Sequence, residues 1–381
     1  MHFDLTSAQQ CIKDNARKFA QEEIAPLADR CEEAAEWPYE LWRKLGKLGY
    51  TGILVPEEYG GSGMSILDYI LILEEFARAD DSFAIAFQVH HAVSHLFLSY
   101  ASEDHRRKYL PVLASGEKVG AFALTEPNAG SDASAIQTRA VLKDGEWVIN
   151  GTKIFITNAG LENSLGVILM AVSGRDADGK NEISSFIVPK DTPGFIMGNK
   201  FRKIGWNLMD TRELIFDDCR IPEGNLFGVR GKGISQALGG LNLGRIDFGA
   251  VATGMAQAAL DYSLKHAKER VQFGKPISKF QAIQFKLADM AVNVRIARAM
   301  TYRAAWLKDQ GLPHQVEATI AKLVGSELAR KNVDMGFQIH GGYGFMKEYP
   351  ISRLYRNVKM MEIGEGTSEV CRMVIARALE C

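Results

Sequence analysis

Residues 138–156 read TRAVLKDGEWVINGTKIFI, and this stretch decides the fold. Apolar and polar side chains alternate along much of it, which is the period of a strand with one buried face. The dipeptides Asp144-Gly145 and Asn150-Gly151 interrupt the alternation, and such pairs favour two-residue hairpin turns. The stretch therefore predicts three short strands joined by two hairpins: Thr138–Lys143, Glu146–Ile149 and Lys153–Ile156.

More strands extend this β segment on both sides. The hydrophobic period changes from 3.6 to 2 around Gly120, and further strands are expected at Val119–Thr125, Gly166–Val172, Ser184–Val188 and Glu213–Phe216. Several short strands at this spacing are typical of a small antiparallel barrel or sandwich. Pro222 and the glycines up to Gly233 then form a linker, so a middle β domain is expected at residues 118–229.

Both flanks of the β segment have the helical period. Ile12, Ala16 and Phe19 recur at helical spacing near the start of the chain. After Gly233 the helical pattern persists, and residues 283–297 place an apolar side chain at every third or fourth position, as in a bundle helix. We expect an N-terminal helical domain at residues 1–117 and a C-terminal helical bundle at residues 230–381. The fold class is α+β, mostly α.

Composition excludes several kinds of partner. The chain has 381 residues and a net charge of −1, whereas phosphate binding needs a basic excess on some face, so nucleic acid is not expected as a partner. The longest apolar stretch, residues 165–172, is too short to cross a bilayer, and the first residues do not resemble a secretory signal. No His/Cys cluster has the spacing of a zinc site. The five cysteines form no CxxC pair and are expected to be reduced, which indicates a cytoplasmic protein.

An acid stands between two glycines near the end of the chain, in Gly364-Glu365-Gly366. The flanking glycines allow a sharp bend and close approach to a ligand. Apolar residues just upstream indicate semi-buried surroundings, which would raise the pKa of Glu365 towards that of a useful general base. On this stretch alone, an exposed acid in a strand-to-helix turn is the favoured interpretation. Thr367 is expected to cap the last helix.

Four other stretches carry residues suited to a flat, phosphorylated ligand. Leu124-Thr125 begins a turn of small hydroxyl residues after the first strand, and Phe155-Ile156-Thr157 ends another strand with an aromatic ring and a hydroxyl. Residues 270–276 contain a basic turn, and Gly341-Gly342 lets the backbone come close to a ligand. Each of these stretches could equally be an ordinary turn.

Taken together and in order, these motifs are similar to those of the acyl-CoA dehydrogenase family. The matching residues are Thr125-Glu126-Pro127, Gly130-Ser131-Asp132, Phe155-Ile156-Thr157, Arg270, Phe273-Gly274, Gln338, Gly341-Gly342 and Glu365 to Glu369, together with Pro56 to Gly61. The resemblance implies a helical domain, a middle antiparallel β-barrel and a C-terminal four-helix bundle. It also implies FAD and an α,β-dehydrogenation of an acyl-CoA thioester to the 2-enoyl-CoA, as in fatty acid or carboxylic acid degradation.

The resemblance assigns roles to individual residues. Glu365 would be the catalytic base that takes the α-proton. The residues that would hold FAD are Leu124, Thr125, Phe155, Thr157, Arg270, Phe273, Gln281, Gln338, Gly341, Gly342, Thr367 and Glu369, with the group from Arg270 to Gly342 contributed across a subunit interface. Those that would bind the substrate are Ser131, Asn242, Arg245 and Gly366. Phe155 stands where many members carry Trp, and Asn242 stands where several carry Asp. A homotetramer and an electron-transfer flavoprotein as electron acceptor are also implied.

Three departures bear on the substrate. Some relatives carry the base on a helix directly before an Arg, but that position here is Gly244. Many relatives carry Tyr before the catalytic acid, where this chain has Gly364. Two small residues would leave space for a branched or cyclic acyl group, unless Met360, Met361 or Phe248 fills it. Residues 80–104 contain no Arg or Lys, so a neutral acyl chain is expected, with the histidines at 90, 91 and 95 as possible exceptions.

Two alternative functions remain open at this stage. A family member could carry out other flavin chemistry, such as oxidation by O₂ or an additional elimination. A non-enzymatic flavin- or acyl-CoA-binding relative could have kept the fold, although the intact Glu365 disfavours this alternative.

Overall fold

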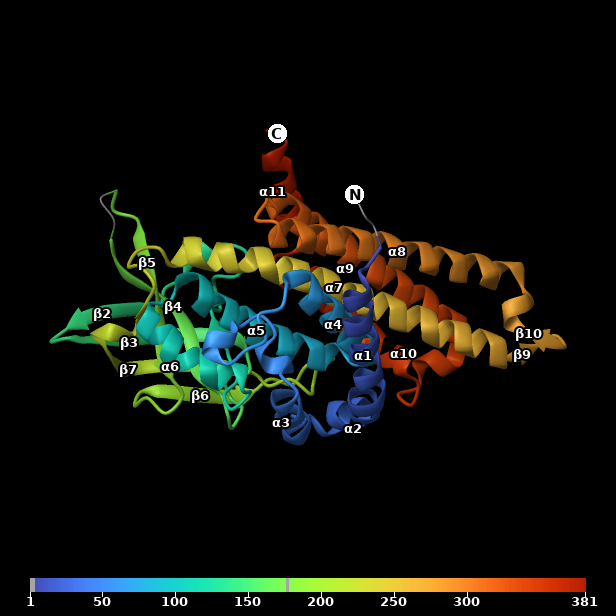
Figure 1. Ribbon diagram of the computed structural model, residues 1–381, viewed down its shortest axis with the longest axis horizontal. Helices are drawn as coiled ribbons and strands as arrows, with labels where there is room; N and C mark the ends of the chain where they lie inside the picture. The colour runs from blue at the N-terminus through green and yellow to red at the C-terminus, as the bar shows by residue number, and fades with distance from the viewer. Residues whose placement is uncertain (1–3, 176–177) are drawn as a thin grey trace.

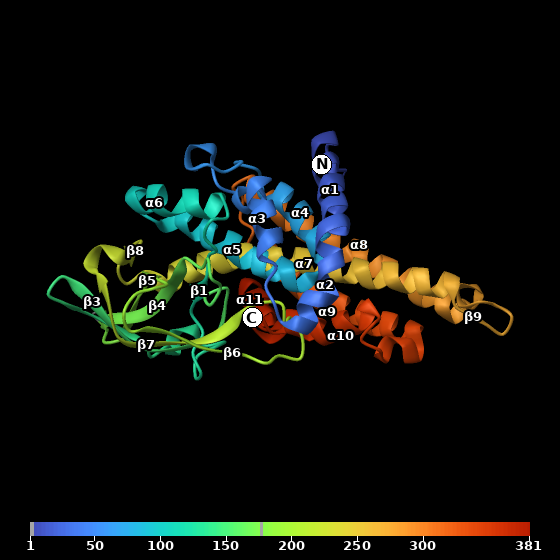
Figure 2. The ribbon, with the colours of Figure 1, turned by 90° about the horizontal axis from the view of Figure 1, so that it is seen from below.

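The computed structural model describes residues 4–175 and 178–381. A β-sheet region occupies one end of an elongated molecule, one long helix runs from it to the opposite end, and two further long helices pack alongside this one (Figure 1). The N-terminal helices pack across the middle of these long helices (Figure 2). The predicted sequence of a helical, a β and a second helical part is therefore correct.

The N-terminal part is helical up to residue 114. Its helices are α1 (Ser7–Phe19), continued by a π-helical turn (Ala20–Ile24), α2 (Ala25–Ala34), α3 (Tyr39–Lys47), α4 (Ile66–Ala79), α5 (Asp81–Tyr100) and α6 (Glu103–Ala114). Side-chain caps fix where several of them begin. Thr6 and Gln9 form a capping box before α1, and the Asp80 carboxylate accepts a hydrogen bond from the Phe83 N–H at the start of α5.

The middle part is one large sheet. Its strands are β1 (Phe122–Ala123), β2 (Arg139–Lys143), β3 (Glu146–Thr157), β4 (Gly166–Arg175), β5 (Asn181–Pro189), β6 (Phe195–Lys200), β7 (Thr211–Pro222) and β8 (Leu226–Phe227). Along the sheet the order is β6-β7-β3-β2-β4-β5-β8, with β1 beside β4. The β1–β4 and β2–β4 pairs are parallel and the others antiparallel. No pairing joins β6 to β8 within the described residues, so closure into the expected antiparallel barrel is not confirmed.

One of the two predicted hairpins is wrong. Asp144 and Gly145 have φ of 52° and 80° and connect β2 to β3 in a two-residue turn, as predicted. Asn150-Gly151 instead lies inside the continuous strand β3, at a register shift opposite β7. The Asn150 side chain donates to the Asp218 carboxylate (3.0 Å) and accepts from the Asp218 N–H (2.9 Å). This cross-strand pairing stabilises a β-bulge at the dipeptide, where the sequence pattern had indicated a turn.

The C-terminal part consists of three long helices and two short ones. The long helices are α7 (Gly233–Glu269), α8 (Gln281–Asp309) and α9 (Gln315–His340), and the short ones are α10 (Pro350–Asn357) and α11 (Ser368–Ala378). A small hairpin of β9 (Val271–Gln272) and β10 (Lys275–Pro276) joins α7 to α8. The three long helices pack on one another, but α11 has only 11 residues, so a bundle of four full-length helices is not confirmed. In the described parts of the chain, no helix is long and apolar enough to span a membrane.

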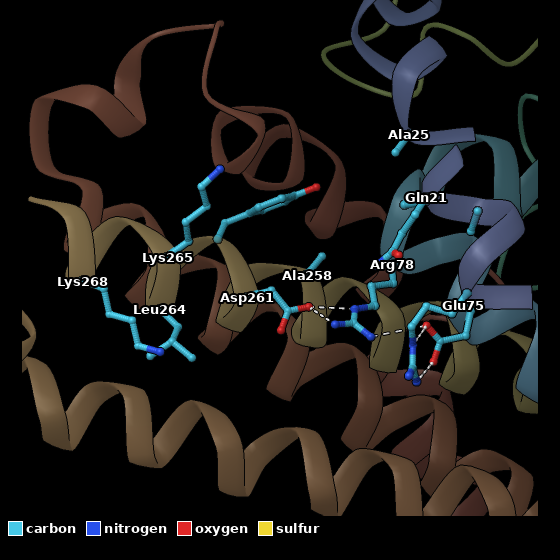
Figure 3. Close-up of a pocket in the computed structure, with 13 residues that line it drawn as sticks. Gln21, Ala25, Glu75, Arg78, Ala258, Asp261, Leu264, Lys265 and Lys268 are labelled. Carbon is cyan, nitrogen blue, oxygen red and sulfur yellow. Dashed lines mark hydrogen bonds and ion pairs between the residues drawn. The ribbon is translucent and has the colours of Figure 1, made fainter. Parts of the chain in front are cut away.

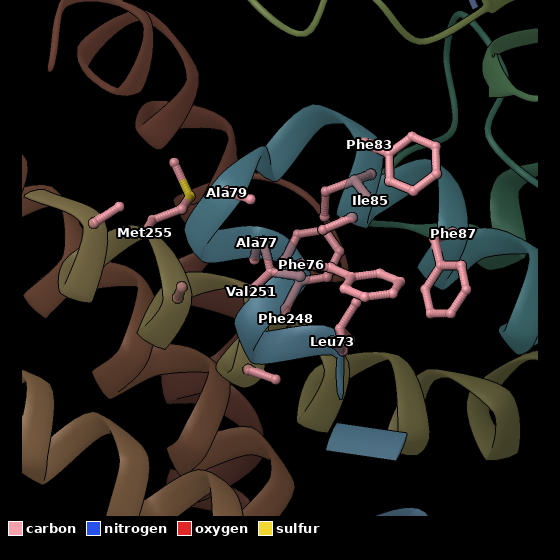
Figure 4. Close-up of a cluster of buried hydrophobic side chains, with 14 of the residues drawn as sticks. Leu73, Phe76, Ala77, Ala79, Phe83, Ile85, Phe87, Phe248, Val251 and Met255 are labelled. Carbon is pink, nitrogen blue, oxygen red and sulfur yellow. The ribbon is translucent and has the colours of Figure 1, made fainter. Parts of the chain in front are cut away.

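Helix α7 packs against the N-terminal part through small residues. A Cβ at Gly254 would lie 2.4 Å from the Glu74 carbonyl oxygen and 2.9 Å from the Arg78 nitrogen, so α4 crosses α7 in close backbone contact. Buried aromatic and aliphatic side chains surround this crossing, among them Phe76 of α4 and Val251 of α7 (Figure 4). The main core of the molecule is therefore shared by the two helical parts.

Substitution of Gly254 by Ala tests this close packing. The gain in helix propensity is about 1 kcal/mol, whereas overpacking against backbone atoms costs about 1–3 kcal/mol. We expect Gly254→Ala to lower the midpoint of thermal unfolding by several degrees, as measured by circular dichroism. Gly224→Ala is the control, because a Cβ there meets nothing within 4 Å. Equal midpoints for the two variants would contradict the packing argument.

Candidate active site

Glu365 lies in a tight turn between a 3₁₀ segment (Val358–Glu362) and α11. Its φ is 55° and that of Gly366 is 96°, so the chain bends through left-handed backbone at an acid. Lys322 of α9 donates a hydrogen bond to the Gly366 carbonyl oxygen (2.6 Å), and Thr367 caps α11 by accepting from the Val370 N–H (3.2 Å). The turn follows a short helical segment, so the strand-to-helix interpretation was wrong about what precedes it.

The Glu365 carboxyl is held in surroundings that favour its neutral form. Its Oε2 atom is buried and has no hydrogen-bond partner within the described residues. Burial raises the pKa of Glu365 to about 7, although the nearby charges of Arg245 and Lys322 act to lower it. Arg245 itself is buried and donates to the Thr319 hydroxyl (3.1 Å). The arrangement therefore gives a carboxyl that can change its protonation state near neutral pH.

The two spaces expected beside Glu365 are filled. A Cβ at Gly244 would lie 2.7 Å from Glu365 Oε2, so the carboxyl itself occupies the room that this glycine leaves on α7. A Cβ at Gly364 would lie 3.0 Å from the ring of Phe248, so this ring fills the second space. The expectation that these two positions leave open space is therefore wrong, and the alternative in which Phe248 fills the gap is correct.

A buried ion pair fixes the loop that carries Leu124 and Thr125. Lys153 of β3 donates to Glu126 Oε1 (2.7 Å) and to the Leu124 carbonyl oxygen (2.9 Å). The Glu126 carboxylate also accepts from the N–H groups of Gln137 and Thr138. Burial raises the pKa of Glu126, but these hydrogen bonds, led by that of Lys153, bring it below its ordinary value. The loop is thereby attached to the strand that ends at Thr157.

Phe155 and Thr157 lie beside that loop at the end of β3. The Ile154 N–H donates to the Thr125 carbonyl oxygen (2.9 Å), which places the two predicted segments side by side. Phe155 has a φ of 62° and is 61% exposed, so its ring lies at the surface, where a flat ligand could stack. Next to them, the Asn158 amide donates to the Ala86 carbonyl oxygen of α5 (2.9 Å), which attaches this strand end to the helical core.

A second group of predicted residues lies at the opposite end of α7. This helix has 37 residues and is therefore about 55 Å long. Gly233 at its start packs against Met170 and Ile183 of the sheet, and the β9–β10 hairpin lies beyond its end (Figure 1). Phe273 at the tip of this hairpin is 93% exposed. Arg270, Gln281, Gln338, Gly341 and Gly342 belong to this distal group. One copy of the chain does not bring the two groups together.

The remaining predicted residues lie nearer to Glu365 or to the sheet. Asn242 is half-buried on α7, three residues before Arg245, whereas Glu369 is exposed on the first turn of α11 and Ser131 is exposed in the loop after β1. Lys153, Lys322 and Asp247 were not predicted as site residues. A sequence signal existed for Asp247, because it is a single charged residue between the apolar residues Ile246 and Phe248.

A separate cavity of about 610 Å³ lies between α1, α4 and α7 (Figure 3). Its acidic groups are already paired, because Arg17 forms an ion pair with Glu75 (2.8 Å) and Arg78 forms one with Asp261 (2.6 Å). Glu365 does not line it. This cavity therefore offers no unpaired acid comparable to Glu365.

Comparison with known proteins identifies the class of protein to which this fold belongs. Three family models match the chain, for the N-terminal domain (residues 6–117), the middle domain (residues 121–219) and the C-terminal domain (residues 231–380) of acyl-CoA dehydrogenases. The chain belongs to the acyl-CoA dehydrogenase family, whose members are FAD-dependent oxidoreductases.

Individual relatives agree with this assignment over the full length. The chain is 48% identical to the probable acyl-CoA dehydrogenase YngJ of Bacillus subtilis, over 100% of both proteins. Butyryl-CoA dehydrogenase from Megasphaera elsdenii has a similar structure, with a TM-score of 0.96 and 41% identity over 100% of both chains. A chain solved in work on the electron transferring flavoprotein of Acidaminococcus fermentans matches with a TM-score of 0.96 and 44% identity, over 100% of this chain and 99% of that one.

The Lys153–Glu126 pair can be tested by removing one partner at a time. Breaking a buried pair from one side costs about 3–5 kcal/mol, because the other charge stays buried and unpaired. We expect Lys153→Met to lower the thermal midpoint strongly and to reduce the flavin content of the purified protein, because the Leu124–Thr125 loop is released.

The double variant Lys153→Met/Glu126→Gln is the matched control for this prediction. It removes both charges, so it is expected to be more stable than Lys153→Met alone. Strictly additive losses in the double-mutant cycle would show that the two side chains do not act as a pair.

Proposed function

We propose that the protein catalyses the FAD-dependent α,β-dehydrogenation of an acyl-CoA thioester to the 2-enoyl-CoA, with Glu365 as the base. The proposal rests on the state of the Glu365 carboxyl. Its Oε2 atom is buried and has no hydrogen-bond partner within the described residues, and burial raises the pKa of Glu365 to about 7. An α-proton next to a thioester is weakly acidic, so its removal needs a desolvated base of this kind.

Glu365 takes the α-proton, and the electron pair of that C–H bond forms the new double bond as a hydride leaves Cβ. The carboxylate form is available near neutral pH because Arg245 and Lys322 partly offset the effect of burial. The Glu365 N–H donates no hydrogen bond within the described chain, which leaves it free to bind the thioester oxygen where negative charge develops. Lys322 donates a hydrogen bond to the Gly366 carbonyl oxygen and so restrains the turn that carries this N–H.

The residues beside the sheet suit the ring system of FAD. Bound FAD supplies the acceptor for the hydride from Cβ. The exposed Phe155 ring offers a flat apolar wall, and Leu124, Thr125 and Thr157 border the same strand end. A Cβ at Gly341 or Gly342 would meet nothing within 4 Å, so the backbone there is open to a bulky group. Thr367 and Glu369 are assigned to FAD by family resemblance, and Ser131, Asn242 and Gly366 to the substrate.

The two groups of FAD residues imply an oligomer. They lie at opposite ends of the helix α7, which is about 55 Å long. We therefore propose that the distal group, with Arg270 and Phe273, contacts the FAD of a neighbouring copy in a homotetramer. The electron acceptor that we propose is an electron-transfer flavoprotein, supported by the structural relative solved in work on such a protein.

The acyl group that we propose is neutral and short, and either straight, branched or cyclic. Helix α5 contains no Arg or Lys, and burial lowers the pKa of His90 to about 4 and that of His91 to about 3, so both are neutral. A distal carboxylate on the substrate would find no cation on this helix. Because Phe248 fills the space at Gly364, the shape of the pocket no longer favours a branched or cyclic chain over a straight one.

Glu365→Gln removes the proton acceptor and keeps the size of the side chain. We expect a folded, yellow protein whose anaerobic flavin reduction by butyryl-CoA is slower by several orders of magnitude. In the wild type, kcat/KM should rise with pH around a midpoint of about 7, because the ionised carboxylate is the reactive form. The control is Glu362→Gln, because Glu362 is paired with Arg330 (2.6 Å). Fast flavin reduction in Glu365→Gln would disprove the assignment.

Arg270→Ala tests the contribution of the neighbouring copy. If Arg270 supports FAD across an interface, then cofactor binding and assembly are linked by mass action. We expect the variant to lose FAD, to have a lower thermal midpoint and to recover partly when FAD is added. Light scattering of the wild type supplies the second measurement, and a monomer that retains full FAD would be incompatible with this arrangement.

A further inference from the structure

A cluster of buried polar side chains lies behind Glu365. Tyr69 of α4, Gln88 of α5 and Asp247 of α7 form it, and we call it the Asp247 cluster. All three are at most 1% exposed. Gln88 Nε2 donates to Asp247 Oδ2 (3.2 Å), but Asp247 Oδ1, Gln88 Oε1 and the Tyr69 hydroxyl have no hydrogen-bond partner within residues 4–175 and 178–381. Three unpaired polar atoms therefore come from three different helices.

Unpaired polar atoms in a packed core cost free energy, so such a cluster is uncommon without a ligand or water that completes it. The chain neighbours Phe87, Ile246 and Phe248 of the cluster are buried and apolar. Asp247 forms no ion pair in the described chain. Burial, with a smaller contribution from the charge of Glu365, raises the pKa of Asp247 well above its ordinary value.

Asp247 lies on the same face of α7 as Gly244, the position against which the Glu365 carboxyl packs. Asp247 follows Gly244 by three residues, and side chains at this spacing are neighbours about 5–6 Å apart. Phe248, one residue further, contacts the Gly364 position. The Asp247 cluster therefore lies about one helical turn from the position on α7 that the Glu365 carboxyl packs against.

The geometry points to the Asp247 cluster as a recognition site for a hydroxyl group on the acyl chain of the substrate. This inference rests on the proposed function and specifies its substrate class. A hydroxyl both donates and accepts, so it can donate to Gln88 Oε1 or Asp247 Oδ1 and accept from the Tyr69 hydroxyl. A plain methyl group would leave all three atoms unpaired.

Other polar substituents fit the cluster less well. A carboxylate would lie beside two acids, Asp247 and Glu365, and helix α5 contains no Arg or Lys to pair with it. Burial lowers the pKa of Lys308, the charge that interacts with Asp247, and burial also lowers the pKa of His95 to about 3. His91, which stacks on Tyr69 (4.8 Å between ring centroids), is neutral as well. A neutral substituent with both a donor and an acceptor matches these surroundings.

The spacing along α7 indicates which carbon of the acyl chain carries the hydroxyl. The Glu365 carboxyl acts on C2. It packs against Gly244, and the Asp247 side chain begins about 5–6 Å from that position along the helix face. An extended chain spans a similar distance between C2 and an oxygen on C5. The substrate class that we assign is therefore a short acyl-CoA with a hydroxyl at its distal end, with 5-hydroxypentanoyl-CoA as the probe.

The experiment compares 5-hydroxypentanoyl-CoA with hexanoyl-CoA, in which a methyl group replaces the hydroxyl. Both are measured by anaerobic flavin reduction of the FAD-loaded protein, with butyryl-CoA as a third substrate. We expect kcat/KM to favour the hydroxylated chain by about tenfold or more, because a site built to bind a hydroxyl disfavours the analogue that lacks it. A preference for hexanoyl-CoA would overturn the inference and indicate that the cluster is satisfied by water.

Two variants and one control separate recognition from structure. Tyr69→Phe removes one oxygen atom and should reduce the preference severalfold, and Asp247→Leu should reverse it in favour of hexanoyl-CoA. Ser94→Ala on the same helix as Gln88 is the control, because Ser94 bonds only to the His90 carbonyl oxygen (3.1 Å), and it should leave the ratio unchanged. If Asp247→Leu fails to fold with FAD, Tyr69→Phe decides the outcome, and an unchanged ratio in it overturns the inference.

The result also distinguishes this inference from the proposed function. Flavin reduction by butyryl-CoA with a preference for hexanoyl-CoA would overturn only the hydroxyl recognition. If no acyl-CoA reduces the flavin, butyryl-CoA included, the dehydrogenation itself is wrong.

Discussion

The close approach of α7 to its neighbours is the constraint on which the rest of the structure depends. This helix contacts the sheet at Gly233, the Glu365 carboxyl at Gly244, helices α8 and α9 at Gly249, and α4 at Gly254. At each of these positions a Cβ would lie less than 3.0 Å from another atom. Glycine lowers the helix propensity of α7, but it allows the N-terminal helices, the sheet and the C-terminal helices to pack closely against the backbone of this one helix. The site is positioned by this packing.

The chemistry of the site results from opposing effects on one carboxyl. Burial raises the pKa of Glu365, and the charges of Arg245 and Lys322 lower it, which leaves it near 7. Arg245 donates a hydrogen bond to Thr319 of α9, whereas Lys322 donates one to the Gly366 carbonyl oxygen in the turn itself. A change at Lys322 would therefore alter both the basicity of Glu365 and the shape of its turn.

The features that could be predicted from the sequence are those that depend on residues close together in the chain. The period change located the sheet, Asp144-Gly145 identified a true hairpin, and the glycines around Glu365 together with its apolar neighbours indicated the raised pKa. The failures involve partners distant in sequence. Asn150-Gly151 forms a bulge because Asp218 pairs with it, and the space at Gly364 is filled by Phe248. Lys153 and Asp247 were missed for the same reason. Their hydrogen-bond partners, Glu126 and Gln88 respectively, are distant in the sequence.

The left-handed backbone at Glu365 has a consequence for how this position changes over evolutionary time. A side chain at a φ of 55° costs about 1–2 kcal/mol relative to glycine, and the buried, unpaired carboxyl adds to that cost. With the proposed role of Glu365 as the base, stability and activity act on position 365 in opposite directions. In a duplicated copy released from selection for activity, stability alone favours replacement of the acid by glycine. Among paralogous copies, an acid retained at this strained position therefore marks a copy that is still under selection for proton transfer.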